Sequence, residues 1–183
     1  MSETLEDFLR AKKKKDEELK QAVDWEKRKT WWLGKINELY KEVKEWLGPL
    51  TSEDILNIKD DTVDIHEERL GTYRAPYLDI NVGSEVVKLM PVGAIIIAAL
   101  GRVDLIGEEG SVKIALEQKG HRPQVRAYIV KEEIAKSKKQ SNLPDYDQMD
   151  TEWIVPTETG RPKKYQILTK EVFHDALKRV MTK

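Results

Sequence analysis

The sequence predicts an α+β protein in which an antiparallel β-meander of about five to seven strands is packed by two helices. Apolar and polar residues alternate with a period of two through most of 62–130, as is typical of strands. The connections within this region are too short for crossover helices, which excludes a doubly wound parallel sheet. Helical apolar stripes lie on either side of it, at 30–47 and 169–181.

Residues 3–28 have a helical pattern that lacks apolar residues in its middle. Leu5, Phe8 and Leu9 are apolar, but the nine residues after them include a single apolar one. A run of four lysines is followed directly by Asp-Glu-Glu, and opposite charges three and four residues apart stabilise an exposed helix. We therefore expect residues 1–28 to form a protruding helical arm that can bind a partner.

The segment 30–47 is predicted to be an aromatic-striped helix that covers the sheet. Its apolar residues alternate at spacings of four and three, and Gly48-Pro49 is expected to end it. Because Trp and Tyr dominate the hot spots of protein interfaces, part of this stripe is a candidate partner-binding surface, with packing on the sheet as the alternative. The candidate partner-binding residues are Trp25, Trp31, Trp32, Tyr40 and Trp46.

The strands of the meander are separated by turn-forming residues. Gly71–Pro76 is expected to be a turn, and Gly83-Ser84 a two-residue hairpin connection. Pro91 and Gly93 predict a bulge or corner, because proline cannot donate to the ladder. The expected strands are 62–67, 77–82, 85–90, 94–100, 102–106, 112–117 and 124–130.

The run 94–100 is continuously apolar for seven residues. A bilayer-spanning helix needs roughly 20 such residues, so this run predicts no membrane segment. Its β-branched content favours a strand covered on both faces. The N-terminus lacks the basic and apolar pattern of a secretory signal, so we expect a cytoplasmic protein without a membrane association.

Two capping patterns predict helix starts. Thr51–Asp54 resembles a capping box for a short helix that ends at about Lys59. Thr169 is expected to cap a closing amphipathic helix, on which Phe173 and Leu177 face the core.

The segment 131–150 is polar and is predicted to be a loop or mobile segment. A last hairpin is expected to pair 153–155 with 165–168. Because no repeat or low-complexity tract divides the chain, we expect residues 1–183 to form a single domain.

Charge is abundant but nearly balanced, with 36% charged residues and a formal net charge of −1. This balance argues against the uniform positive potential of a general nucleic-acid binder. Segment 53–85 has nine acidic and three basic residues, whereas 119–139 and 161–183 each have seven basic and two acidic residues. The basic segments are candidate nucleic-acid surfaces, and the polarity also favours self-association or a protein partner.

One set of residues resembles a catalytic signature. Asp104, followed by Glu117-Gln118-Lys119, resembles the PD-(D/E)xK nucleases, in which an acid and a Glu-x-Lys lie on neighbouring strands. The resemblance implies that Asp104 and Glu117 bind Mg²⁺ while Lys119 orients the attacking water. The family has a helix after the Glu-x-Lys strand, whereas 124–130 has a strand pattern here. A structural pairing of Arg102 with Asp104 is the alternative.

These observations favour a non-catalytic protein. The chain has no cysteine and no P-loop, G-x-S-x-G or G-x-G-x-x-G motif. We therefore expect a cytoplasmic protein-binding factor of accessory, adaptor or immunity type, which requires no cofactor. The alternative is a metal-dependent nuclease that uses Asp104, Glu117 and Lys119 with Mg²⁺.

Overall fold

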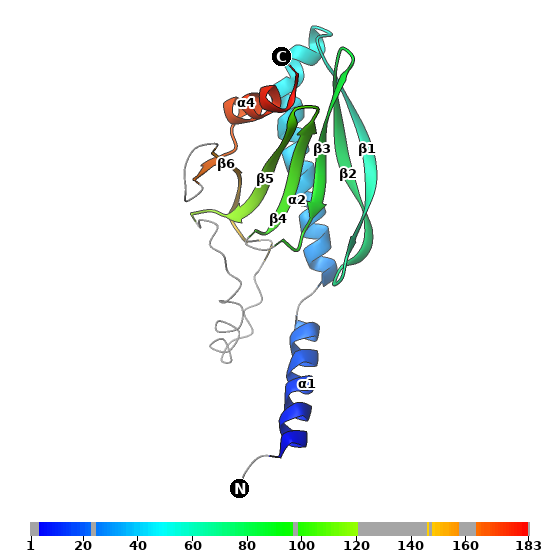
Figure 1. The fold of residues 1–183 in the computed structure, drawn as a ribbon, viewed down its shortest axis with the longest axis vertical. Helices are drawn as coiled ribbons and strands as arrows, with labels where there is room; N and C mark the ends of the chain where they lie inside the picture. Colours follow the sequence, from blue (N-terminus) through cyan, green and yellow to red (C-terminus); the bar gives the residue numbers. More distant parts are fainter. Residues whose placement is uncertain are drawn as a thin grey trace.

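The computed structural model describes residues 4–22, 25–96, 99–120, 146, 148–157 and 164–182, with the backbone alone for 15–22. The elements are α1 (Leu5–Ala22), α2 (Trp25–Ser52), β1 (Asn57–Glu67), β2 (Gly71–Val82), β3 (Glu85–Gly93), β4 (Gly101–Gly107), β5 (Gly110–Gln118), β6 (Thr151–Pro156), β7 (Tyr165–Ile167) and α4 (Lys170–Val180). All seven strands form one antiparallel sheet in sequence order. The predicted α+β meander is thereby confirmed (Figure 1).

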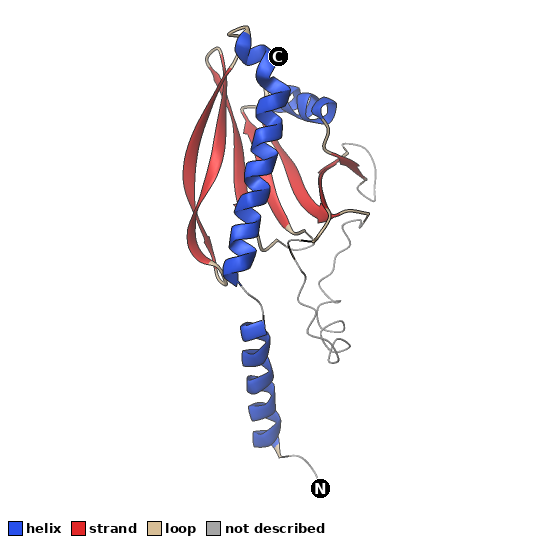
Figure 2. Cartoon of the chain, turned by 180° about the vertical axis from the view of Figure 1, so that it is seen from behind, coloured by secondary structure: helices blue, strands red, loops and turns tan. Residues whose placement is uncertain are grey.

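The core lies between the sheet and α2, which runs across one sheet face (Figure 2). Alternate residues of β2 to β5 point to this face, because successive side chains of a strand alternate between its two faces. The buried stripe of α2 meets them and consists of Trp32, Ile36, Leu39, Val43 and Leu47. The sheet residues buried here include Leu78, Ile80, Val87, Leu89, Val103, Leu105, Ile114 and Leu116.

Two turn predictions are confirmed. Val82 pairs with Glu85 across the two-residue Gly83-Ser84 connection, and Gly83 has φ of +60°, a conformation that glycine adopts without strain. The register between β3 and β4 shifts between Pro91 and Gly93, as expected for a bulge.

The prediction of a strand at 94–100 is wrong. β3 ends at Gly93 and β4 begins at Gly101, and the described residues between them form a connection with one isolated bridge, from Ile96 to Ala99. The ladder with β4 ends after Gly93, which pairs with Arg102. Beyond it, side chains from elsewhere in the chain bind backbone groups of Ala94, Ile95 and Leu100. Periodicity cannot reveal such long-range bonds, and an apolar run rich in β-branched residues has the same pattern in a loop as in a buried strand.

The predicted end of the aromatic helix is also wrong, because α2 continues through Pro49 to Ser52. The hydroxyls of Thr51 and Ser52 donate to the carbonyls of Leu47 and Gly48, four residues earlier. The helix ends where Asp54 takes a φ of +56°.

This end is a Schellman motif, in which Ile55 N–H donates to Leu50 O and Asp54 N–H to Thr51 O. The predicted short helix from Thr51 to about Lys59 is therefore absent, and β1 begins at Asn57.

Gly71–Pro76, predicted to be a turn, belongs to β2. The turn lies just before it, where Leu70 N–H donates to Glu67 O and Gly71 has φ of +70°. Pro76 pairs with Thr62 of β1, whereas β3 pairs with β2 only from Leu78 onward. Pro76 thus occupies a two-stranded part of the sheet, where proline is tolerated.

The C-terminal part follows the prediction. β6 pairs with β7, and Thr169 is the N-cap of α4, where its hydroxyl accepts from Val172 N–H at 3.3 Å. Phe173 is fully buried and Leu177 is 8% exposed, so α4 closes the core beside α2. The expected strand at 124–130 and most of the expected loop at 131–150 lie outside the described residues.

The predicted helix over 3–28 is represented by two elements, α1 and the first turn of α2. Figure 1 shows α1 directed away from the sheet, beyond the end where α2 begins. Its side chains from Leu5 to Lys14 are exposed. Among the helices that the structure describes, none is both long and apolar enough to cross a membrane.

Candidate functional site

Arg102 and Asp104 lie on the sheet face opposite α2 and pair with each other. Arg102 Nε is 3.0 Å from Asp104 Oδ1, and Arg102 Nη2 is 3.3 Å from Oδ2. Burial raises the pKa of Asp104, and the charge of Arg102 opposes that shift. The pair is therefore the structural pairing that the sequence offered as the alternative to a metal site.

The structure does not bring Asp104, Glu117 and Lys119 together. Asp104 pairs with Lys113 across the β4–β5 hairpin, which leaves Glu117 four residues farther along β5. At about 3.3 Å per residue this offset is roughly 13 Å, too far for two carboxylates to share one ion. Glu117 is buried, whereas Lys119 is exposed and lies 3.3 Å from Asp150 Oδ2. Within the described ranges, no three His, Asp or Glu side chains are grouped to hold a metal.

Most of the candidate partner-binding aromatic residues lie in the core. Trp32 is fully buried, and its ring centroid is 6.0 Å from that of Trp153. Trp31 and Tyr40 are also buried, and the Tyr40 hydroxyl donates to Leu89 O. These three residues cannot form the exposed anchors of an interface.

Trp25 and Trp46 are partly exposed. The Trp46 ring packs against Phe173, with centroids 5.7 Å apart, so it bridges α2 and α4. Trp25 is at the start of α2, where the Arg69 guanidinium carbon lies 5.4 Å from its ring centroid. A role in partner binding stays a prediction for these two residues.

A buried cation at the start of α2 fixes the connection between β3 and β4. Arg28 is only 7% exposed, and its Nη2 donates to Ala94 O at 2.8 Å and to Leu100 O. Its guanidinium lies over the rings of Trp31 and Tyr146, at 4.7 and 5.0 Å. Burial lowers the pKa of Arg28, while nearby Tyr146 and Glu67 oppose that shift.

Glu67, at the end of β1, binds backbone N–H groups of the same connection. Its carboxylate accepts from Ala94 N–H at 3.0 Å, from Ile95 N–H at 2.7 Å and from the Tyr73 hydroxyl. A methyl group at Gly93 would lie 3.0 Å from the Glu67 carboxyl carbon, so the glycine admits this close approach. We call Arg28 and Glu67 the clamp.

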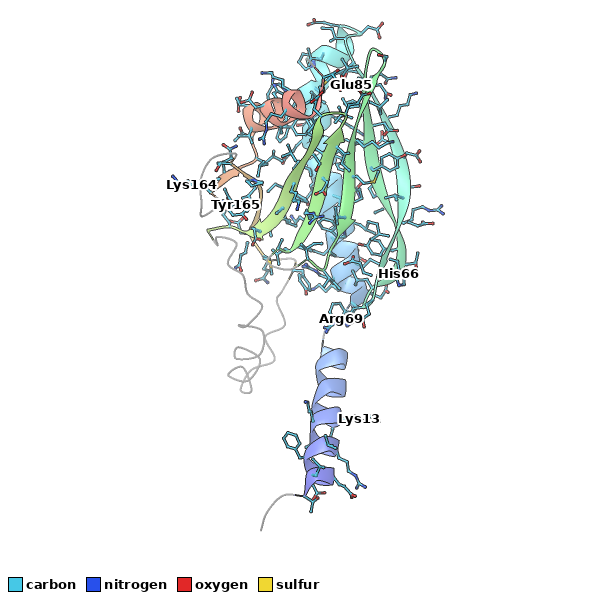
Figure 3. The ribbon with its side chains drawn as sticks, in the orientation of Figure 1. Lys13, His66, Arg69, Glu85, Lys164 and Tyr165 are labelled. Carbon is cyan, nitrogen blue, oxygen red and sulfur yellow. The ribbon has the colours of Figure 1, made fainter. Side chains whose placement is uncertain are left out.

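The connection held by the clamp, which we call the 94–100 loop, is apolar and partly exposed. Within the loop Ala94 is buried, whereas Ile95 is 43% exposed. The end of the molecule that carries this loop also carries Trp25 and Arg69, and Figure 3 shows Arg69 next to the start of α2. Ile95, Trp25 and Arg69 thus place apolar and cationic groups at one end of the sheet.

Sequence reasoning missed both clamp residues. Arg28 was expected in an exposed arm and Glu67 on an ordinary strand, because the bonds of both residues reach far along the chain. An indication was present in the run 94–100, whose seven apolar residues are flanked by Gly93 and Gly101. Glycines at both ends of an apolar run are also typical of a loop with close backbone contacts.

The proposed nucleic-acid surfaces remain predictions. Of 119–139, only Lys119 and Gly120 are described. The described basic residues of 161–183 are exposed, and Lys178 lies 3.3 Å from Asp175.

Comparison with known proteins gives no relative from which a role could be transferred: no protein-family model, no curated protein and no solved structure matches the chain.

Proposed function

We propose that this chain is a non-catalytic, cytoplasmic protein-binding factor of accessory, adaptor or immunity type, and that it binds its partner through the 94–100 loop. Ile95 is the main apolar anchor, and Trp25 and Arg69 lie at the same end of the molecule. The observation that carries the proposal is the clamp, which uses two charged side chains to fix an apolar loop at the surface.

The clamp supports recognition because it removes flexibility before binding. Ordering a loop on binding costs conformational entropy, and a loop held in one conformation avoids most of that cost. Burying a cation is unfavourable unless its polar atoms are bonded, so Arg28 is a costly way to stabilise a simple turn. A buried cation that bonds the carbonyls at both ends of an exposed apolar loop is better explained by the need to present that loop.

The composition of this end of the molecule supports a protein partner over a small ligand. Ile95 is 43% exposed and lines none of the pockets found among the described residues, whereas small-molecule sites are concave. Trp and Arg are enriched in protein interfaces, and Arg69 lies against the Trp25 ring. The expected partner therefore has an apolar pocket for Ile95 and an acidic or aromatic group near Arg69.

The test is a quantitative co-purification from the cells that naturally make this protein. The full chain is compared with Ile95→Asp and with Ile106→Asp, which is a matched control because Ile106 is also an exposed isoleucine, at 40%. Thermal unfolding of each variant checks that the fold is retained. The co-purifying protein is then made separately, and its affinity for each variant is measured by calorimetry.

We expect Ile95→Asp to abolish binding of the purified partner and Ile106→Asp to leave it unchanged. Trp25→Ala should weaken binding without abolishing it, since this residue is at the edge of the proposed interface. Equal binding by the wild type and Ile95→Asp would contradict the proposal. An equal loss in both Asp variants would place the interface elsewhere.

A further inference from the structure

Strand β1 gives the sheet a long edge that has no strand partner among the described residues. It is the first strand in the sheet order and is 11 residues long, and Figures 1 and 2 show it at the margin of the sheet. Its pairing with β2 runs without a bulge, and 57–67 contains no proline. Because a free edge can pair with another strand and neither device protects this one, the charged side chains of β1 decide what can pair with it.

The backbone groups that point to this edge belong to the even-numbered residues of β1. Val82 ends β2 and flanks the two-residue Gly83-Ser84 hairpin, so the even-numbered residues of β2 bond to β3. The odd-numbered residues of β2 therefore bond to β1, and their partners in β1 are also odd-numbered. Thr62 agrees with this alternation, because its partner Pro76 has no N–H and its own N–H donates to Asp61 Oδ1 at 2.7 Å.

The acidic residues of β1 select one register for pairing with a second β1. In an antiparallel pair, the two-fold axis passes through one residue, and residues equally distant from it are opposite each other. An axis at Asp60, Asp61 or Asp64 places that aspartate opposite its own copy, and an axis at Thr62 places Asp60 opposite Asp64. Like charges directly opposite each other are destabilising. Of these five central positions, Val63 is the one that places no acidic residue opposite another.

With the axis at Val63, complementary groups are opposite each other. Asp60 of one copy is opposite His66 of the second, and both side chains are exposed. The Thr72 hydroxyl lies 2.9 Å from His66 Nδ1, so a hydroxyl that donates there leaves His66 Nε2 to donate to Asp60. The charge of Asp60 is also offset within its own chain, because Lys44 Nζ lies 2.5 Å from its carboxylate. The two Val63 side chains meet at the axis.

We propose that two copies of this chain associate by antiparallel pairing of their β1 strands, centred on Val63. The backbone groups of Thr62 bond to those of Asp64 in the second copy, and the Thr62 N–H exchanges its bond to Asp61 for one in the new ladder. The interface is isologous, because the two-fold axis relates each contact to an identical one. The pairing uses no residue of the 94–100 loop, so this inference and the proposed function can fail separately.

Disulfide trapping tests the register, because the chain has no cysteine of its own. Val63→Cys places two thiols opposite each other in a non-hydrogen-bonded pair, where Cα atoms are about 4.5 Å apart and a disulfide can form. Asp61→Cys is the matched control on the same side of the strand, because its two copies would lie four residues, or roughly 13 Å, apart. Under mild oxidation we expect a covalent dimer from Val63→Cys and none from Asp61→Cys. Equal cross-linking of both variants, or none of Val63→Cys, would contradict the pairing.

Light scattering coupled to size-exclusion chromatography measures the mass of the full chain at about 100 µM, where a dimer of micromolar affinity is formed. We expect the wild type to have about twice the mass of one 21.2 kDa chain. Thr62→Asp should be monomeric with an unchanged thermal unfolding curve, because the new carboxylate is opposite Asp64. Asn57→Asp adds the same charge to an exposed residue of β1 outside the paired segment 59–67, and it should stay dimeric. A monomeric wild type would leave the edge to a strand of another protein and overturn the inference, as would a dimeric Thr62→Asp.

Discussion

Gly101→Ala tests the position of Trp32, the largest fully buried side chain of the core. A methyl group at position 101 would lie 2.2 Å from Cζ3 of Trp32 and 2.6 Å from Cε3. The ring cannot withdraw easily, because it is fully buried and lies against Trp153. Overpacking a core of this kind typically costs about 1–3 kcal/mol, and contact with a rigid ring favours the upper half of that range.

Gly34→Ala is the matched control, because a methyl group there meets nothing within 4 Å. It lies inside α2, where alanine is favoured over glycine by about 0.5–1 kcal/mol. In thermal unfolding, a shift of about 2–4 °C per kcal/mol gives a fall in Tm of roughly 4–12 °C for Gly101→Ala and a rise of roughly 1–4 °C for Gly34→Ala. Equal effects of the two substitutions would show that Trp32 does not lie over Gly101.

Three further predictions address the closing helix, the Asp104 pair and catalysis. Leu177→Ala should lower the free energy of unfolding in urea by about 2–5 kcal/mol, because the residue is buried; no change would mean that α4 does not close the core. Burial raises the pKa of the Asp104 carboxyl group, so the native protein binds a proton there at a higher pH than the unfolded chain does. The free energy of unfolding that this carboxyl group contributes therefore falls as the pH rises through its native pKa. The free energy of unfolding of Asp104→Asn should therefore change less with pH above about pH 4 than that of the wild type. The same pH dependence in both proteins would refute this prediction. The purified chain with Mg²⁺ or Mn²⁺ should leave DNA and RNA intact, since Asp104 and Glu117 are four residues out of register; cleavage abolished by both Asp104→Ala and Lys119→Ala would contradict the non-catalytic assignment.

The fold could be predicted from local patterns wherever local chemistry determines the structure. The Gly83-Ser84 hairpin, the shift after Pro91 and the cap at Thr169 each depend on the backbone preferences of one or two residues. The stripe of α2 was visible because helical periodicity and burial agree. The prediction failed at Pro49, because the helix continues past this proline to Ser52.

The candidate site could not be predicted, because it is built from contacts between distant parts of the chain. Arg28 bonds a carbonyl 66 residues away, and Glu67 bonds an amide 28 residues away. No local pattern distinguishes this buried arginine from Lys27 and Lys29 on either side of it, which are not buried. The prediction that Trp31, Trp32 and Tyr40 bind a partner failed for a related reason. A helix face that packs on the sheet and a helix face that binds a partner are made of the same residue types.

The most direct test of the central claim is photo-crosslinking from position 95. The full chain carries a benzophenone amino acid in place of Ile95, or in place of Ile106 as the control, and is irradiated in the cells that naturally make it. The proposed interface predicts a discrete crosslinked protein from position 95 that is absent from position 106 and survives nuclease treatment. No crosslinked protein from position 95, or the same products from both positions, would contradict binding through the 94–100 loop.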